Sequence, residues 1–389
     1  MISSSHPLPA GCRIATLPTA LSRTHFLRRR LPALLALPAL ARAQPVAEIR
    51  LAALLPLTGV LGVLGDETFR GLELAAEERA GAPRFRVLRA DTPDAAPGLA
   101  ELRRLLATER PAAVFGSVSS ALALPVSQAA DAAGLPFFEL NAVAEAITDR
   151  GLRLVWRLGP QAAQFGAVAA EVLTGHVPRL LGMPAEAIRV AIIGSGGLSS
   201  DAICAAAAAS LTAAGITVAG RFNALAAEMA HAVQRMRSLG ADVLLHSGEE
   251  GDVAALFRAF REGAWRPSLL VGMGGGHAVA DTARAAGAGH DGTLVIDVPP
   301  SLPGNPFTDA YRRRYGAAPR SGHSLAAFSL ARPVLDALAG PDLRLGMAAV
   351  DLPLGILANG WGMRMDARQQ NTRAPPVLSV WESGVLRPP

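Results

Sequence analysis

The stretch that decides the fold, IRLAALLPLTGVLGVLGDETFRGLELAAEE, runs from Ile49 to Glu78. Its short apolar run predicts a strand, and the longer pattern at its end predicts an amphipathic helix. A loop with glycines at regular spacing joins the two. A strand, a glycine-rich loop and a helix in this order are typical of a parallel sheet covered by helices.

The loop does not match a nucleotide-binding motif. Gly59, Gly62 and Gly65 have the spacing G-x-x-G-x-x-G, whereas a Walker loop needs G-K-[ST] and a dinucleotide fingerprint needs G-x-G-x-x-G. The chain contains no lysine, so none is present to reach a phosphate. We therefore expect this loop to form one wall of a cleft for a small solute.

The alternation of apolar runs and helical patterns continues through the chain. Nine candidate strands are too many for one sheet of this length, so the sequence predicts two Rossmann-like α/β lobes. Three crossings between the lobes are expected, near residues 156–160, 296–304 and 351–355. The predicted domains are an export signal (1–43), a first lobe (44–158 plus 299–352) and a second lobe (159–298 plus 353–389).

The N-terminal segment has the order of an export signal. Residues 22–30, SRTHFLRRR, are basic, and residues 31–40, LPALLALPAL, are a short apolar core. The small-residue sequence ARA then precedes Gln44, so we expect cleavage near Ala43–Gln44 and a periplasmic mature protein. Thr24 stands where a second arginine would complete a twin-arginine signal, which leaves the export route open.

Charge is concentrated in that segment. All 37 basic residues are arginines, and six of them lie within residues 1–43, which contain no acid. Without this segment the formal net charge falls from +5 to −1. A nearly neutral mature chain predicts no nucleic-acid partner.

Enzyme motifs are incomplete in this sequence. Gly194 and Gly196 follow a strand, but the next strand lacks the acid that would hold a ribose. Residues 322–326, GHSLA, resemble a nucleophile elbow but follow a charged, turn-rich segment rather than a strand. The histidines are scattered, and only Cys204 would remain after cleavage. We therefore expect no catalytic residue, no cofactor and no metal site.

The mature chain resembles the type 1 periplasmic solute-binding proteins, in the group that binds leucine, isoleucine and valine. The likeness begins with the stretch quoted above and continues in order through RADTPDAAPGLAELRRLL, AVFGSVSSALALPVSQAADAAGLPFF and LVWRLGPQAAQFG. It ends with GWGMRMDARQQNTRAPPVLSVWESGVL, in which Gln369 replaces a glycine of the family's D-x-x-G-Q-N hairpin. The resemblance implies two lobes joined by a three-crossing hinge, with the ligand bound in the cleft.

The resemblance also implies a set of ligand-binding positions. Ser120, beside Ser119, takes the place of the serine that binds a ligand carboxylate, and Gly274 takes the place of the acid that pairs with a ligand ammonium. The predicted site residues are Thr58, Leu64, Ser119, Ser120, Asn141, Ala142, Val143, Leu198, Glu250 and Gly274.

These substitutions predict an altered specificity. A buried ammonium without a counter-charge costs several kcal/mol, roughly, and Gly274 supplies no charge. The expected ligand therefore has an anionic or polar head, an apolar body and no ammonium, unless Glu249 or Glu250 replaces the missing acid. Alternatively, residues 248–252, GEEGD, are the solvent-exposed start of a helix. Their acids then interact favourably with the helix dipole and do not bind a ligand.

The resemblance implies the solute-binding component of an ABC importer, acting as a monomer with a permease in the inner membrane. Two alternatives stay open. A sensor or regulatory protein can use the same fold, and a dinucleotide-dependent enzyme is the second alternative.

Overall fold

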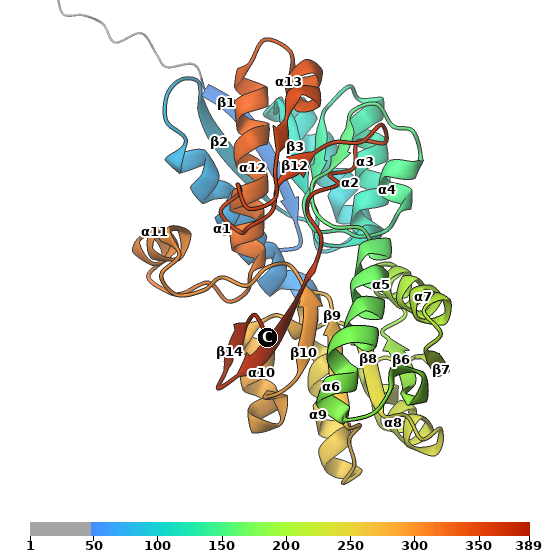
Figure 1. The fold of residues 1–389 in the computed structure, drawn as a ribbon. Coiled ribbons are helices and arrows are strands. Elements are labelled where there is room, and N and C mark those ends of the chain that lie inside the picture. Colours follow the sequence, from blue (N-terminus) through green and yellow to red (C-terminus); the bar gives the residue numbers. More distant parts are fainter. Residues whose placement is uncertain (1–47) are drawn as a thin grey trace, which may run out of the picture. The chain divides into compact units, whose positions relative to one another are not determined.

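A computed structural model describes residues 48–389; the predicted export signal and its cleavage site lie outside them. The described residues form two largely parallel sheets with helices on both faces, which confirms the predicted fold class (Figure 1). Both sheets belong to one unit, residues 45–389. No helix within residues 48–389 has the length and apolar composition needed to cross a membrane.

The first lobe is built on a five-stranded parallel sheet with the order β2-β1-β3-β4-β5. Leu51 and Leu55 of strand β1 pack into a core with α1 and α12, while Leu54 packs into a second core with α2 and α3. Its strands are β1 (Glu48–Leu55), β2 (Arg84–Asp91), β3 (Ala113–Gly116), β4 (Phe137–Glu139) and β5 (Val155–Arg157). Its helices are α1 (Gly62–Glu78), α2 (Ala95–Thr108), α3 (Ser120–Ala132), α4 (Ala146–Asp149), α11 (Pro306–Tyr315), α12 (His323–Ala339) and α13 (Leu343–Ala349).

The second lobe is built on a seven-stranded sheet with the order β14-β13-β10-β9-β8-β6-β7, in which β13 and β14 are antiparallel additions. Helices α5 and α7 cover one face, and α8 and α9 cover the other. Its strands are β6 (Arg189–Gly194), β7 (Thr217–Asn223), β8 (Val243–Ser247), β9 (Leu269–Met273), β10 (Leu294–Asp297), β13 (Val377–Glu382) and β14 (Val385–Arg387). Its helices are α5 (Ala162–Glu171), α6 (Val177–Leu181), α7 (Leu198–Ala213), α8 (Met229–Ser238), α9 (Glu250–Glu262) and α10 (Ala280–Ala286).

The third crossing lies later in the chain than the sequence predicts. Residues 353–389 were expected in the second lobe, but Trp361, Met363 and Ala374 pack in the core of the first lobe. This segment folds back because β11 (Asp351–Leu352) pairs with β12 (Met363–Arg364). Only the β13–β14 hairpin belongs to the second sheet, where it lies beside β10.

The loop before that crossing is tied to the first crossing. The Gln370 side chain donates a hydrogen bond to the Gly159 carbonyl at 3.0 Å, and the Asn371 side chain donates one to the Leu158 carbonyl at 2.9 Å. Gln369 has φ 63°, a left-handed conformation that suits the glycine found there in the resembling family. The two crossings therefore form one hydrogen-bonded unit.

Candidate functional site

A small cavity lies between the two lobes, at the carboxyl ends of their strands. Its volume is about 60 Å³, whereas ligand pockets usually measure about 300–1,000 Å³. The cavity is therefore smaller than an ordinary ligand pocket. The first lobe contributes Leu61, Leu64, Val118, Asn141, Val143, Val298 and His323, and the second contributes Phe165, Ser199, Ser200, Ile203, Ser247, Gly248, Glu249, Met273, Gly274, Gly275, Gly276 and Asp297, with Pro160 at a crossing.

Four of the ten predicted site residues line this cavity. Leu64 and Val143 provide apolar surface, Asn141 provides an amide, and Gly274 follows β9 with φ 89°. The other six lie outside the lining, and they are Thr58, Ser119, Ser120, Ala142, Leu198 and Glu250.

Thr58 and Gly65, in the glycine loop, make their close contacts within the first lobe rather than with the cavity. The Thr58 hydroxyl donates to the Asp91 carboxylate at 2.6 Å, and the Leu57 N–H donates to it at 2.9 Å. A Cβ on Gly65 would lie 1.8 Å from the Pro56 carbonyl oxygen, so this glycine allows α1 to start against the end of β1. We expected the glycines of this loop to bring the backbone close to a solute. At Gly65 the close approach is instead to the Pro56 carbonyl, within the first lobe.

Ser120 begins α3, but its polar groups have partners within the protein. Its hydroxyl oxygen accepts hydrogen bonds from the N–H groups of Val143 and Ala144, both at 3.2 Å. Its own N–H donates to the Ser199 hydroxyl oxygen at 3.1 Å, and that hydroxyl donates back to the Ser120 hydroxyl at 2.9 Å. Ser120 and Ser199 thus form a direct contact between the lobes, at the position predicted for a ligand carboxylate.

Leu198 and Glu250 do not line the cavity, but a residue next to each of them in the sequence does. Leu198 is 43% exposed, and the next two residues, Ser199 and Ser200, line the cavity in its place. Glu250 is the first residue of α9, while Glu249 precedes the helix and lines the cavity. At these two helix starts the cavity is therefore lined by Ser199, Ser200 and Glu249 rather than by the predicted Leu198 and Glu250.

Glu249 has acidic neighbours and no cation. The Asp252 carboxylate accepts a hydrogen bond from the Glu249 N–H at 3.1 Å, which caps the helix. Within residues 48–389, no arginine or histidine forms an ion pair with Glu249. Desolvation, together with the nearby Asp252 and Glu250 carboxylates, raises the pKa of Glu249 to about 7.

Asp297 and His323 are cavity residues that the sequence reasoning missed. Asp297 ends β10 and His323 begins α12, and the two residues are 3% and 4% exposed. The His323 Nε2 lies 3.7 Å from the Asp297 Oδ2, too far for a hydrogen bond. Burial raises the pKa of Asp297. Little in the sequence indicated that either residue belongs to a site. Asp297 lies in the segment predicted as the second crossing, and His323 lies in the GHSLA segment, which does not follow a strand as a nucleophile elbow must.

Two further histidines support the wall behind the cavity. His246 in β8 and His277 after β9 are both fully buried, with His246 Nδ1 2.7 Å from His277 Nε2. Burial lowers the pKa of His246 to about 3, so the pair is neutral. Ser247 and Gly276, each adjacent in sequence to one of these histidines, line the cavity.

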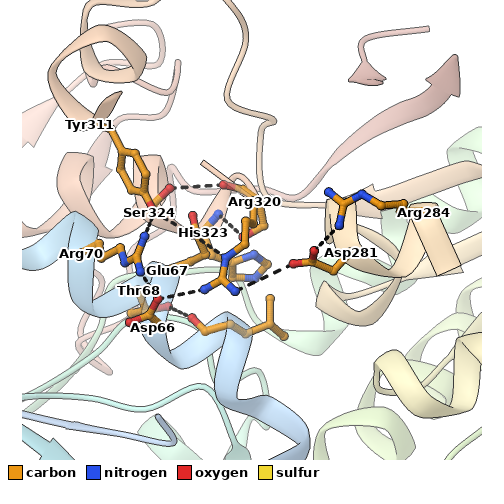
Figure 2. A network of polar contacts seen from close by, with 12 residues as sticks. Asp66, Glu67, Thr68, Arg70, Asp281, Arg284, Tyr311, Arg320, His323 and Ser324 are labelled. Atoms are coloured by element: carbon orange, nitrogen blue, oxygen red, sulfur yellow. Dashed lines mark hydrogen bonds and ion pairs between the residues drawn. The ribbon is translucent and has the colours of Figure 1, made fainter. Parts of the chain in front are cut away.

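An ionic network joins the lobes outside the cavity (Figure 2). Arg320 lies between α1 and α10, where its guanidinium contacts Asp66 at 2.8 Å, Glu67 at 3.2 Å and Asp281 at 3.8 Å. The Tyr311 hydroxyl also donates to Glu67 at 2.7 Å. The acids of this network therefore have an arginine partner, whereas no arginine among residues 48–389 pairs with Glu249 or Asp297.

Comparisons with known proteins agree with this architecture. A family model described as periplasmic binding protein matches residues 48–343. The chain is 35% identical over 371 residues to Leu/Ile/Val-binding protein homolog 7 of Brucella melitensis, covering 89% of this chain and 92% of that protein. It is 31% identical over 364 residues to Leu/Ile/Val-binding protein homolog 8 of Brucella abortus, covering 88% and 90%.

Two solved structures show the same fold at low sequence identity. The leucine binding protein LivK from Thermotoga maritima has a TM-score of 0.75 at 18% identity, covering 87% of this chain and 97% of that one. A solute binding protein of an ABC transporter from Rhodopseudomonas palustris HaA2, in complex with p-hydroxybenzoic acid, has a TM-score of 0.73 at 20% identity, covering 88% and 95%.

Proposed function

The chain belongs to the periplasmic binding protein family, and from that premise we propose that it is the exported solute-binding component of an ABC importer. It would capture a small polar solute between its lobes and present the closed form to a permease in the inner membrane. The relatives are named as binding proteins rather than enzymes. The proposed role requires no cofactor, and one copy of the chain is sufficient for it.

The observation that carries this proposal is a cavity lined from both lobes. Asn141 and His323 come from the first lobe, while Glu249, Met273 and Asp297 come from the second. A solute in this position touches both lobes only when they are closed, so binding favours the closed form. The crossings after β5 and β10 and before β13 provide the hinge.

The test begins with the protein purified from its native host without refolding. We expect mass spectrometry of the denatured protein to identify a small solute at close to one copy per chain. Small-angle scattering with and without that solute should show a smaller radius of gyration when it is bound. A protein that carries no solute and binds none in a metabolite screen, or one whose radius of gyration does not change, would contradict the proposal.

A further inference from the structure

The geometry points to a solute that carries a positively charged amine, bound by Asn141, Glu249 and Asp297. This inference rests on the proposed function, because it identifies the chemical class of the solute that the cavity binds. It differs from the expectation drawn from resemblance, in which the loss of the acid at Gly274 removes the site for an ammonium.

The charged groups of the cavity favour a cation. Glu249 and Asp297 are the only acids in its lining, and within residues 48–389 no arginine lines it. The chain contains no lysine. Among residues 48–389, His323 is the one basic side chain in the lining, and its Nε2 lies 3.7 Å from the Asp297 Oδ2. Glu249 has no such neighbour, so a cation would provide the counter-charge that Glu249 lacks, whereas an anion would be repelled by it.

Asp297 has an acceptor atom free for a ligand. The residue is 3% exposed, and its Oδ2 has no hydrogen-bond partner among residues 48–389. Buried carboxylate oxygens are normally hydrogen-bonded, because an unpaired one loses the stabilisation that water provides. An N–H donor from a bound solute would satisfy this atom.

Asn141 presents a second free acceptor on the opposite lobe. Its amide nitrogen donates to the Thr68 hydroxyl oxygen at 2.9 Å, and that hydroxyl donates to the Leu64 carbonyl at 2.8 Å. Because the Thr68 proton is already used, the amide must turn its nitrogen toward Thr68. The Asn141 Oδ1 therefore remains as an acceptor, and it has no partner among residues 48–389.

These groups match the donors of a primary ammonium. An –NH₃⁺ group has three N–H donors and no acceptor, and the cavity offers Asn141 Oδ1, Asp297 Oδ2 and the Glu249 carboxylate. The backbone donor that Ser120 would offer a carboxylate is already used, since its N–H bonds to Ser199. A solute without a carboxylate therefore has the better polar match.

The other residues of the lining indicate the chemistry of the part of the solute that lies away from the amine. Leu64, Val143, Phe165, Ile203 and Met273 are apolar and come from both lobes. They favour a short alkyl or aryl group attached to the amine. The expected class is a small primary amine with an apolar body.

The test compares head groups on one apolar body. Calorimetry at pH 7.5 with 3-methylbutylamine, leucine and 4-methyl-2-oxopentanoate presents a cation, a zwitterion and an anion on the same branched chain. The same three head groups on a benzyl body control for the shape of the solute. We expect the amine to bind at least about tenfold more tightly than the keto acid of the same body.

Two isosteric variants test the assigned groups. Glu249→Gln and Asp297→Asn should each weaken amine binding by about tenfold or more, while the matched control Glu262→Gln, an exposed residue at the far end of α9, should change it less than about twofold. Circular dichroism and thermal unfolding check that each variant is folded, and Glu249→Gln alone suffices if Asp297→Asn does not fold.

Each outcome decides between the inferences. Tighter binding of the keto acids or of the amino acids than of the amines, an anionic solute released from the native protein, or amine binding unchanged in Glu249→Gln would overturn this inference and leave the proposed function intact. No binding of any solute, natural or supplied, would overturn both.

Discussion

Two glutamates near the cleft, one in each lobe, differ in the partners that their carboxylates have. Glu139, at the end of β4, is fully buried and accepts hydrogen bonds at both oxygens. The Ser117 N–H donates at 2.7 Å and its hydroxyl at 3.1 Å, while the N–H groups of Asn141 and Ala142 donate at 3.0 and 2.8 Å. This carboxylate holds the turn that follows β4 and positions Asn141.

Glu249 has no such set of donors. Its neighbours are the acids Asp252 and Glu250, and it faces the cavity. Desolvation raises the pKa of both Glu139 and Glu249 to about 7, but hydrogen bonds oppose the shift only at Glu139. The comparison teaches that burial alone does not identify a binding residue. A carboxylate with all its partners supports the structure, and one without partners is available to a ligand.

The largest expected effect is the difference in stability between two matched variants. Glu139→Gln should lower the free energy of unfolding by about 2–4 kcal/mol, because an amide NH₂ cannot accept the hydrogen bonds that one oxygen now accepts. Glu249→Gln should not lower it, and near neutral pH should raise it, because the amide removes a desolvated charge whose pKa is raised by burial and by acidic neighbours. Urea denaturation followed by circular dichroism measures both. Equal losses in the two variants would break the comparison.

The pH dependence of stability should sharpen the comparison. The folded pKa of Glu249 is about 7, well above its ordinary value near 4.3 in an unfolded chain. The folded state therefore binds more protons than the unfolded state between these values, so its stability falls as the pH rises from about 4.5 to 7.

We expect Glu249→Gln to reduce that fall by about 1–3 kcal/mol, while Glu139 and Asp297 continue to contribute a fall of the same sign. Asp252, Glu250 and His323 also face this region, and Asp252→Asn provides a control for the acidic neighbours. Unfolding curves at pH 5.0, 6.0 and 7.5 measure the effect. A variant whose stability has the same pH dependence as the native protein would show that Glu249 is ionised in the folded state.

The smallest expected effect concerns the paired acids of the ionic network (Figure 2). Asp281→Asn removes one contact of Arg320, at 3.8 Å, while Asp66 and Glu67 keep theirs. Half-exposed ion pairs contribute about 1 kcal/mol or less, so amine affinity measured by calorimetry should fall less than about fivefold. A loss as large as that of Asp297→Asn would show that the network, rather than the cavity acids, controls binding.

Local patterns were sufficient to predict most of the fold. Apolar runs such as residues 190–194 became buried strands, and the segments between them became covering helices. The third crossing was placed too early, because the turns after Asp351 suggested a change of lobe. Trp361 and Met363 instead return to the first core through the β11–β12 pairing, a long-range contact that no local pattern encodes.

The site was predicted less well, since it depends on contacts between distant segments. Leu64, Asn141, Val143 and Gly274 lie in the cavity lining, while Ser120 does not, because it is paired with Ser199, 79 positions away in the sequence. Which of the two adjacent glutamates, Glu249 or Glu250, faces the cavity depends on the residue at which α9 begins. A one-residue change at a helix start turns a side chain by about 100°, which follows from 3.6 residues per turn.

The sequence by itself determined the two-lobed α/β architecture, the family resemblance and the region of the cleft, because these depend on periodicity and on the order of segments. Only the tertiary structure decided which polar groups in that region have partners. Asp297 and Asn141 come from different lobes, and their free oxygens become evident only when every nearby donor is located. Hydrogen bonding is satisfied in three dimensions, so the atoms left available to a ligand are a property of the folded chain.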